Sequence, residues 1–196
     1  MGCLKAAFRF VVYVFAIIGV FAVTQGKIEF NFKNAPAADR GELISQAKPF
    51  GDFSKLQSDY KLSKTLDVMG YKKMTVIHTP SDQKTIFLDT KNKITEKDFD
   101  NKNIDKILIE KTILFSNLPI NVQNLKITKR GNLLINKKAS KYILFEGDVE
   151  NLPYDKIKGI AGVYKIQNNH ILYFSIRNAK KFSFKINSDI LSIIKY

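Results

Sequence analysis

Two short groups of carboxylates are the side chains in this chain best suited to acid–base chemistry. They are Asp98, Asp100 and Asp105, followed later by Glu146, Asp148 and Glu150. Paired carboxylates carry out glycoside hydrolysis, and alternate residues of a β-strand lie on the same side of it. Gly147 interrupts the second group, however, and residues 149–151 read as the start of a loop. The pattern therefore favours a solvated strand end over a catalytic pair.

Histidine and cysteine residues are too few to suggest a metal site. The chain holds His78, His170 and Cys3, without the clustered spacing typical of zinc ligands. It has no Gly-x-Ser-x-Gly elbow, and both histidines lie in ordinary contexts, so a Ser/His/Asp triad has little support. We therefore expect no catalytic residue, no metal ligand and no cofactor, and the sequence favours a non-enzymatic protein.

Residues 159–162 have the Gly-x-x-Gly spacing of the RNA-binding loops in KH domains. The two middle residues of those loops are often basic, whereas here they are Ile160 and Ala161, and a strand pattern follows. We interpret this stretch as a turn or β-bulge that needs glycine, with no role in RNA binding.

Aromatic residues are frequent, with 15 Phe, 8 Tyr and no Trp. One interpretation is an aromatic-rich core. The other is an apolar sheet face that binds an acyl chain or another hydrophobic ligand, with a basic rim for an anionic head group. The pattern does not separate them, because a core and a pocket use the same residue types. The candidate ligand-lining residues are Tyr142, Phe174, Phe182, Phe184 and Ile186.

Short runs with a period of two predict the strands that must position these side chains. The expected strands are Lys72–Thr79, Lys84–Thr90, Lys106–Ser116, Ile120–Ile127, Leu133–Asn136, Lys141–Glu146, Gly162–Gln167, His170–Ile176 and Lys181–Asn187. The alternation slips near Asn124, as it would at a β-bulge, and residues 129–132 read as a turn. The last three strands would form a meander, with Asn168 and Asn169 in a two-residue turn.

Helix start and stop signals predict few helices. The expected helical segments are Asp39–Lys48, Phe53–Met69 ended by Gly70, a brief turn with Thr95 and Asp98 as a capping box, and Asp189–Tyr196 capped by Ser188. Together with the strands, they predict an α+β fold dominated by antiparallel β-sheet.

The first 26 residues differ in character from the rest of the chain. Residues 6–23 are apolar or small except for Arg9, long enough at about 1.5 Å per residue to cross a hydrocarbon core. This pattern predicts a transmembrane anchor with a cytoplasmic N-terminus, or alternatively a cleaved signal peptide. We expect three parts: the anchor or signal at 1–26, a tether with a short helix at 27–51, and a β-rich extracytoplasmic domain at 52–196.

The net charge of +14 is large, and +12 remains beyond residue 26, because Lys5 and Arg9 are the only charged residues before it. Such a charge suits nucleic acid, an anionic membrane surface or an acidic polymer. The lysines are scattered, however, and the chain has only four arginines. Proteins that bind nucleic acid usually cluster lysines and arginines on one helix or strand. With export expected as well, we predict no nucleic-acid partner.

The layout of a short leader, one span and a β-rich exported domain is similar to that of the bitopic lipid-transport proteins of bacterial envelopes. It implies a non-enzymatic envelope protein whose exported domain binds an amphiphilic lipid or a partner protein. The alternative is an anchored or secreted hydrolase acting on an anionic cell-wall or surface polymer, which its basic surface would attract.

Overall fold

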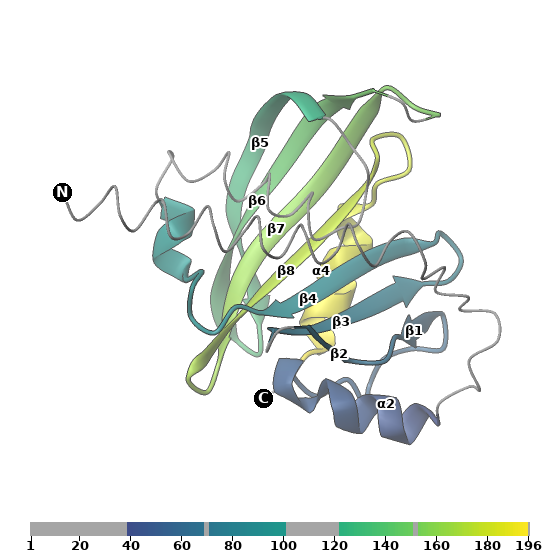
Figure 1. The fold of residues 1–196 in the computed structure, drawn as a ribbon, viewed down its shortest axis with the longest axis vertical. Helices are drawn as coiled ribbons and strands as arrows, with labels where there is room; N and C mark the ends of the chain where they lie inside the picture. Colours follow the sequence, from purple (N-terminus) through teal and green to yellow (C-terminus); the bar gives the residue numbers. More distant parts are fainter. Residues whose placement is uncertain (1–38, 69–70, 101–121, 151–152, 196) are drawn as a thin grey trace. The chain divides into compact units, whose positions relative to one another are not determined.

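A computed structural model of the protein describes residues 39–68, 71–100, 122–150 and 153–195 (Figure 1). These residues form mostly antiparallel β-sheet. The strands are β1 (Tyr60–Leu62), β2 (Leu66–Val68), β3 (Tyr71–His78), β4 (Gln83–Asp89), β5 (Val122–Ile135), β6 (Lys138–Val149), β7 (Lys156–Ile166) and β8 (Asn169–Asn178). The helices are α2 (Arg40–Ala47) and α4 (Phe184–Ile193), with short 3-10 helices η1 (Lys48–Phe50) and η2 (Glu96–Asp100).

The strands form one sheet in the order β1-β3-β4-β8-β7-β6-β5, with β2 also paired to β3. Three hairpins, β3–β4, β5–β6 and β7–β8, supply most of it. The long-range step is the pairing of β4 with β8, which begins at Ile86 and Phe174. The first residues of β4 and the last residues of β8 lie outside this ladder, and the two strands diverge there beside α4 (Figure 1).

The sheet carries an apolar core on each face. On the face that we call the α4 face, Phe87 and Tyr173 pack with buried residues of α2, η1 and α4. On the opposite face, the η2 face, Phe145 and Phe174 pack with Phe99 of η2. Because adjacent residues of a strand point to opposite faces, Tyr173 and Phe174 enter different cores.

Several local predictions are confirmed. Asp39 caps α2, where its side chain accepts a hydrogen bond from the Gly41 backbone N–H. The β3 and β4 strands lie where alternation placed them. The register of β5 shifts between Gln123 and Lys126, and Asn124 has a φ of 50°, as a β-bulge requires. Each of these features depends on neighbouring residues alone.

The helix predicted over Phe53–Met69 is wrong. Residues 60–62 and 66–68 form β1 and β2, which both pair with β3. The apolar spacing of this segment fits a helix only loosely. The open edge of β3 offers a row of unpaired backbone groups to an extended segment, and these hydrogen bonds outweigh the weak local helical preference. Helix α2 belongs to the same compact unit as the sheet.

The third strand of the predicted meander is also wrong. Phe182, Phe184 and Ile186 alternate as in a strand, but α4 begins at Phe184, and the Ser183 side chain accepts a hydrogen bond from the Ile186 N–H. This helix starts five residues before the predicted one. Tertiary structure contributes to the difference, because β8 pairs with β7 along its length and with β4 over residues 171–174, which leaves only the short edge of residues 175–178 for a further strand.

Three turn predictions also need correction. Residues 129–132 lie inside the continuous strand β5, and the chain reverses at Asn136 and Lys137, both with positive φ. The β7–β8 turn uses Gln167 and Asn168, one residue earlier than predicted. Residues 159–162 lie in the interior of β7 with unbroken pairing to β8, so they form neither a turn nor a bulge.

The predicted anchor or signal at 1–26, the first part of the tether and the strand Lys106–Ser116 lie outside the described residues. Within the described ranges, none of the helices has the length and apolar character needed to cross a membrane.

Candidate functional site

The carboxylates that opened the sequence analysis bind separate partners. Strand β6 continues past Gly147 to Val149, so Glu146 and Asp148 do share one side of it. Glu146 pairs with Lys158, at 2.6 Å between Oε1 and Nζ. Asp148 accepts a hydrogen bond of 2.8 Å from the Asn124 amide. These two acidic groups are thus held apart by different partners and do not converge on a substrate position.

The other carboxylates serve similar structural roles. Glu150 accepts a hydrogen bond from Gln123 at 2.7 Å. Asp98 accepts from the Thr95 backbone N–H at 2.7 Å, which is the predicted cap of η2. Asp100 accepts from the Lys141 ammonium at 2.6 Å. Asp105 lies outside the described residues.

Four of the five candidate ligand-lining residues gather on the α4 face. Tyr142 is buried there, and its ring lies 5.5 Å from the ring of Phe184, with Phe182 and Ile186 beside them. Phe174 is separate, because it is fully buried in the core of the η2 face. Strand alternation alone could not place these residues together, since Phe184 and Ile186 belong to helix α4 and Phe182 lies in the segment before it.

Five apolar side chains on the α4 face are only partly buried, and we call them the apolar patch. They are Leu133 of β5, Leu144 of β6, and Phe182, Phe184 and Ile186 at the start of α4. Helix α4 contacts β5 as well as the sheet beneath it, so side chains from distant parts of the sequence meet here. The patch presents carbon surface to solvent at the edge of a closed core.

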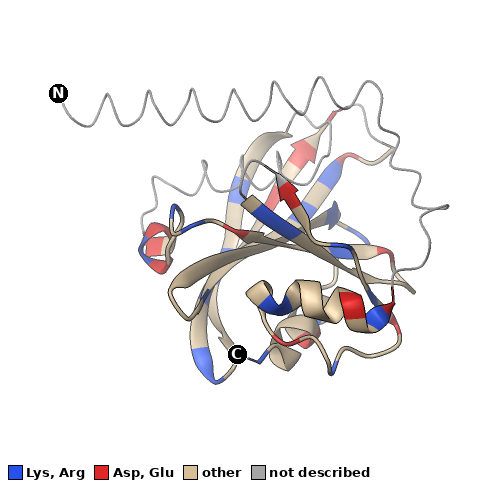
Figure 2. Ribbon diagram, turned by 60° about the horizontal axis from the view of Figure 1, so that its bottom comes forward, with Lys and Arg blue, Asp and Glu red and all other residues tan. Residues whose placement is uncertain are grey.

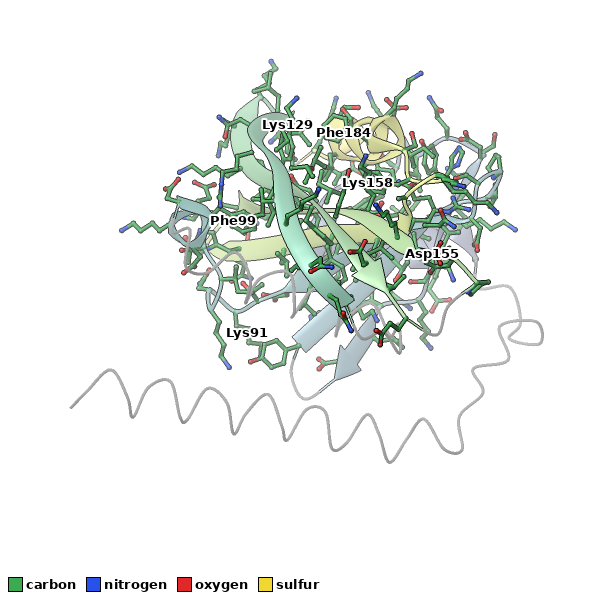
Figure 3. The ribbon with its side chains drawn as sticks, turned by 90° about the horizontal axis from the view of Figure 1, so that it is seen from above. Lys91, Phe99, Lys129, Asp155, Lys158 and Phe184 are labelled. Carbon is green, nitrogen blue, oxygen red and sulfur yellow. The ribbon has the colours of Figure 1, made fainter. Side chains whose placement is uncertain are left out.

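A row of charged residues crosses four strands next to the apolar patch. Lys126 pairs in register with Glu146, Glu146 with Lys158, and Lys158 with Arg177. Cross-strand partners share a face, and Glu146 lies on the same side of β6 as Leu144, so this charged row lies on the α4 face. Figure 3 shows Lys158 and Lys129 on the same side of the sheet as Phe184.

The excess positive charge is concentrated in the half of the domain that carries these residues. Residues 122–150 and 153–195 contain 14 Lys and Arg against 5 Asp and Glu, whereas residues 39–68 and 71–100 contain 11 against 10. The basic residues lie along and at the ends of strands β5–β8 (Figure 2). Most of the excess positive charge of the described residues thus lies in one half of the sheet, on both of its faces.

His78 joins a second polar cluster at the opposite edge of the sheet. Its Nδ1 lies 2.7 Å from the Ser81 hydroxyl, and its Nε2 lies 3.4 Å from the Asp59 carboxylate. The Tyr60 ring packs on His78 at 5.0 Å. Burial raises the pKa of Tyr60, and the charges of Asp189 and Asp59 add to this rise. With Nε2 protonated, Nδ1 can accept the hydroxyl proton, so this order resembles a carboxylate–imidazole–hydroxyl relay.

Sequence reasoning missed this cluster. Asp59 fell within the predicted helix, and nothing local indicated that β1 would pair with the end of β3. Ser81 lies in the predicted β3–β4 turn, and its contact with His78 is the only part that sequence spacing could have signalled. The other histidine, His170, bonds through Nδ1 to the Asn92 amide oxygen at 2.6 Å, close to the β7–β8 turn.

No group of three His, Cys, Asp or Glu side chains in the described ranges is arranged to hold a metal ion. Comparison with models of known protein families and with curated proteins found no match.

Proposed function

We propose that this protein is a membrane-anchored envelope protein whose β-rich domain binds an amphiphilic, anionic ligand on the α4 face. The observation that carries the proposal is that the charged row lies next to the partly buried apolar patch, since Glu146 follows Leu144 on the same side of β6. Apolar side chains such as Phe184 and Leu144 would receive an acyl chain, and Lys158 and Lys129 would lie beside its head group. A ligand with both chemistries matches both surfaces.

The apolar patch and the charged row would each contribute to the free energy of ligand binding. Burial of an acyl chain gains about 25 cal/mol for each Å² of apolar surface removed from water. Cations beside the patch add attraction that decays over about 10 Å at 0.1 M salt. The basic half of the domain would also draw the domain towards an anionic membrane surface. An N-terminal anchor, proposed from residues 1–26, would keep the domain near its lipid source.

The first test uses two adjacent leucines of β5. Leu133 belongs to the apolar patch, whereas Leu134 lies on the other face of the strand and is 70% exposed. Full-length protein is purified from membranes and analysed by native mass spectrometry. We expect wild type and Leu134→Asn to retain lipid, and Leu133→Asn to lose most of it, because a polar side chain in the patch removes apolar contact. Circular dichroism confirms that both variants are folded.

The alternatives give different spectra. Retention of a stoichiometric protein instead of lipid would replace the lipid assignment with a partner-protein assignment. Equal lipid retention by Leu133→Asn and Leu134→Asn would contradict the apolar patch as the binding surface. A wild-type spectrum with neither species would contradict ligand binding altogether.

A hydrolase is the second candidate, and the Ser81–His78–Asp59 contacts favour it. In this reaction the Ser81 hydroxyl attacks an ester carbonyl while its proton moves to His78, which then passes it to the leaving alcohol. Water then attacks the acyl-serine and gives its proton to His78, which passes it to the Ser81 oxygen as the acid is released. An ester on an anionic surface polymer fits the basic surface of the domain.

This candidate is tested by labelling with a fluorophosphonate, which reacts with activated serines. If the candidate is correct, wild type and the exposed-serine control Ser58→Ala gain one label in intact mass spectra, and Ser81→Ala gains none. Ester hydrolysis should fall by about 10²-fold or more in Ser81→Ala, the usual contribution of acid–base and nucleophilic groups. Absence of labelling in wild type would exclude Ser81 as a nucleophile.

A further inference from the structure

We propose that Arg177 and Lys158 form a binding site for a phosphate group. This inference rests on the proposed function in one respect, since it assigns the chemistry of the ligand's head group. It adds a specific anion and two specific residues on β8 and β7 to that function. The argument depends on the charges of the row, on two buried polar atoms without partners, and on the position of the apolar patch.

Two cations face each other across neighbouring strands at this position. Lys158 and Arg177 are register partners on β7 and β8, and neighbouring strands lie only about 4.8 Å apart. Like charges directly opposite each other destabilise a sheet. Glu146 lies on the far side of Lys158 and pairs with it at 2.6 Å. The one carboxylate of the row therefore neutralises Lys158 and lies two strands from Arg177.

The guanidinium group of Arg177 lacks a hydrogen-bond acceptor at one of its nitrogen atoms among the described residues. Its Nη1 atom is buried and has no hydrogen-bond acceptor within the described part of the chain. A buried donor without an acceptor costs about 1–3 kcal/mol, and more when the donor is charged. The hydroxyl of Ser175, two residues earlier on the same face of β8, is also buried without a partner. Two neighbouring donors that lack acceptors indicate that an acceptor-rich group belongs here.

A phosphate group supplies what these residues lack. Its oxygens accept several hydrogen bonds at once, and the planar guanidinium binds them in pairs. Its negative charge would separate the positive charges of Arg177 and Lys158. Carboxylates fit less well, because a phosphate has a third free oxygen and more negative charge, so the arginine, the lysine and the serine can bind separate oxygens.

The apolar patch begins one tight turn beyond this site. The Phe182 N–H donates to the Asn178 carbonyl at 3.0 Å, so Phe182, one residue of the patch, lies close to the end of β8 that carries Arg177. A phosphate held at Arg177 would therefore place an attached acyl chain towards the patch. The shared chemistry is the phosphate group, and it can come from a phospholipid or from a small soluble phosphate.

The test uses full-length protein in neutral detergent and three matched probes. Glycerol phosphate carries phosphate without chains, dihexanoylglycerol carries chains without phosphate, and dihexanoyl phosphatidic acid carries both. Binding is followed as the rise in Tm with probe concentration. Arg177→Gln removes the guanidinium group and its charge, whereas Arg177→Lys keeps the charge but loses the paired hydrogen bonds. Lys165→Gln is the control for Lys158→Gln, because Lys165 is an exposed lysine on the same strand.

We expect both phosphate probes to bind wild type and Lys165→Gln. Their affinity should fall about tenfold or more in Arg177→Gln and Lys158→Gln, because each loses a charge-assisted hydrogen bond. Arg177→Lys should show a smaller loss. Dihexanoylglycerol should bind all these variants equally, which also shows that they are folded.

The outcomes separate this inference from the proposed function. Unchanged phosphate affinity in Arg177→Gln would overturn the phosphate site, even if the chains still bind. Equal affinity for glycerol phosphate and phosphatidic acid would support the phosphate site with a soluble ligand and overturn the amphiphile function. Failure of all three probes to bind wild type would overturn both.

Discussion

Replacement of Gly162 by alanine is expected to lower the free energy of unfolding by about 3 kcal/mol or more, since overpacking of a tight core has costs of this order. A Cβ atom at Gly162 would lie 2.2 Å from the Tyr173 hydroxyl and 2.7 Å from the Lys141 carbonyl oxygen. Neither atom can move away easily, because Tyr173 is fully buried and the carbonyl belongs to a neighbouring strand. Urea unfolding followed by circular dichroism measures the loss.

Gly41→Ala is the matched control for this prediction. The same added methyl group would meet nothing closer than 3.3 Å, the end of the Asp39 side chain, so stability should change by less than about 1 kcal/mol. Combining Gly162→Ala with Tyr173→Leu should recover part of the loss if the clash with the ring causes it. Equal stability of Gly162→Ala and wild type would contradict the close approach of Tyr173 to β7.

Gln83→Leu is expected to lower the free energy of unfolding by about 2 kcal/mol, because it leaves the partly buried Ser183 N–H without its acceptor and removes one of the two donors to the Ser183 carbonyl, the other being the Asn187 amide. Gln83 is fully buried where β4 and β8 diverge. Its amide accepts from the Ser183 N–H at 2.9 Å and donates to the Ser183 carbonyl at 2.8 Å. One side chain thus joins β4 to the start of α4 as a second strand would.

The same substitution should weaken ligand retention, since α4 carries Phe184 of the apolar patch. Hydrogen exchange should show faster exchange of α4 amides than of β7 amides in Gln83→Leu. Gln57→Leu, at an exposed position, is the control and should leave both unchanged. Uniform exchange throughout the domain would show that Gln83 supports global stability without a specific role in holding α4.

Local chemistry explains most of what sequence reasoning predicted correctly. An aspartate such as Asp39 caps a helix because its side chain accepts a hydrogen bond from an N–H group of the first turn. Asn124 tolerates positive φ more readily than most residues, so a phase slip beside it predicts a bulge. The strands β3, β4 and β8 likewise follow from alternation in their own residues, whereas only the second half of β7 was predicted. These predictions need no knowledge of distant segments.

The two errors between helix and strand share one cause, which is competition for strand edges. Residues 60–62 and 66–68 became strands because β3 had a free edge, whereas residues 181–187 met only the short unpaired edge of β8 at residues 175–178. The two segments have locally ambiguous patterns, and only the arrangement of the other strands decided between helix and strand. The candidate site depends on the same decision, because Phe182, Phe184 and Ile186 reach the α4 face through a helix.

The sequence by itself determined the antiparallel β-rich class, the caps at Asp39 and Asp98, the bulge at Asn124 and the excess of positive charge, since each depends on composition or on adjacent residues. The expectation of an N-terminal anchor also comes from sequence alone. Only the tertiary structure decided that Lys158 and Arg177 face each other, and that Asp59 meets His78 and Ser81. Register between strands places residues from distant parts of the chain together, and no local pattern specifies which edges will meet.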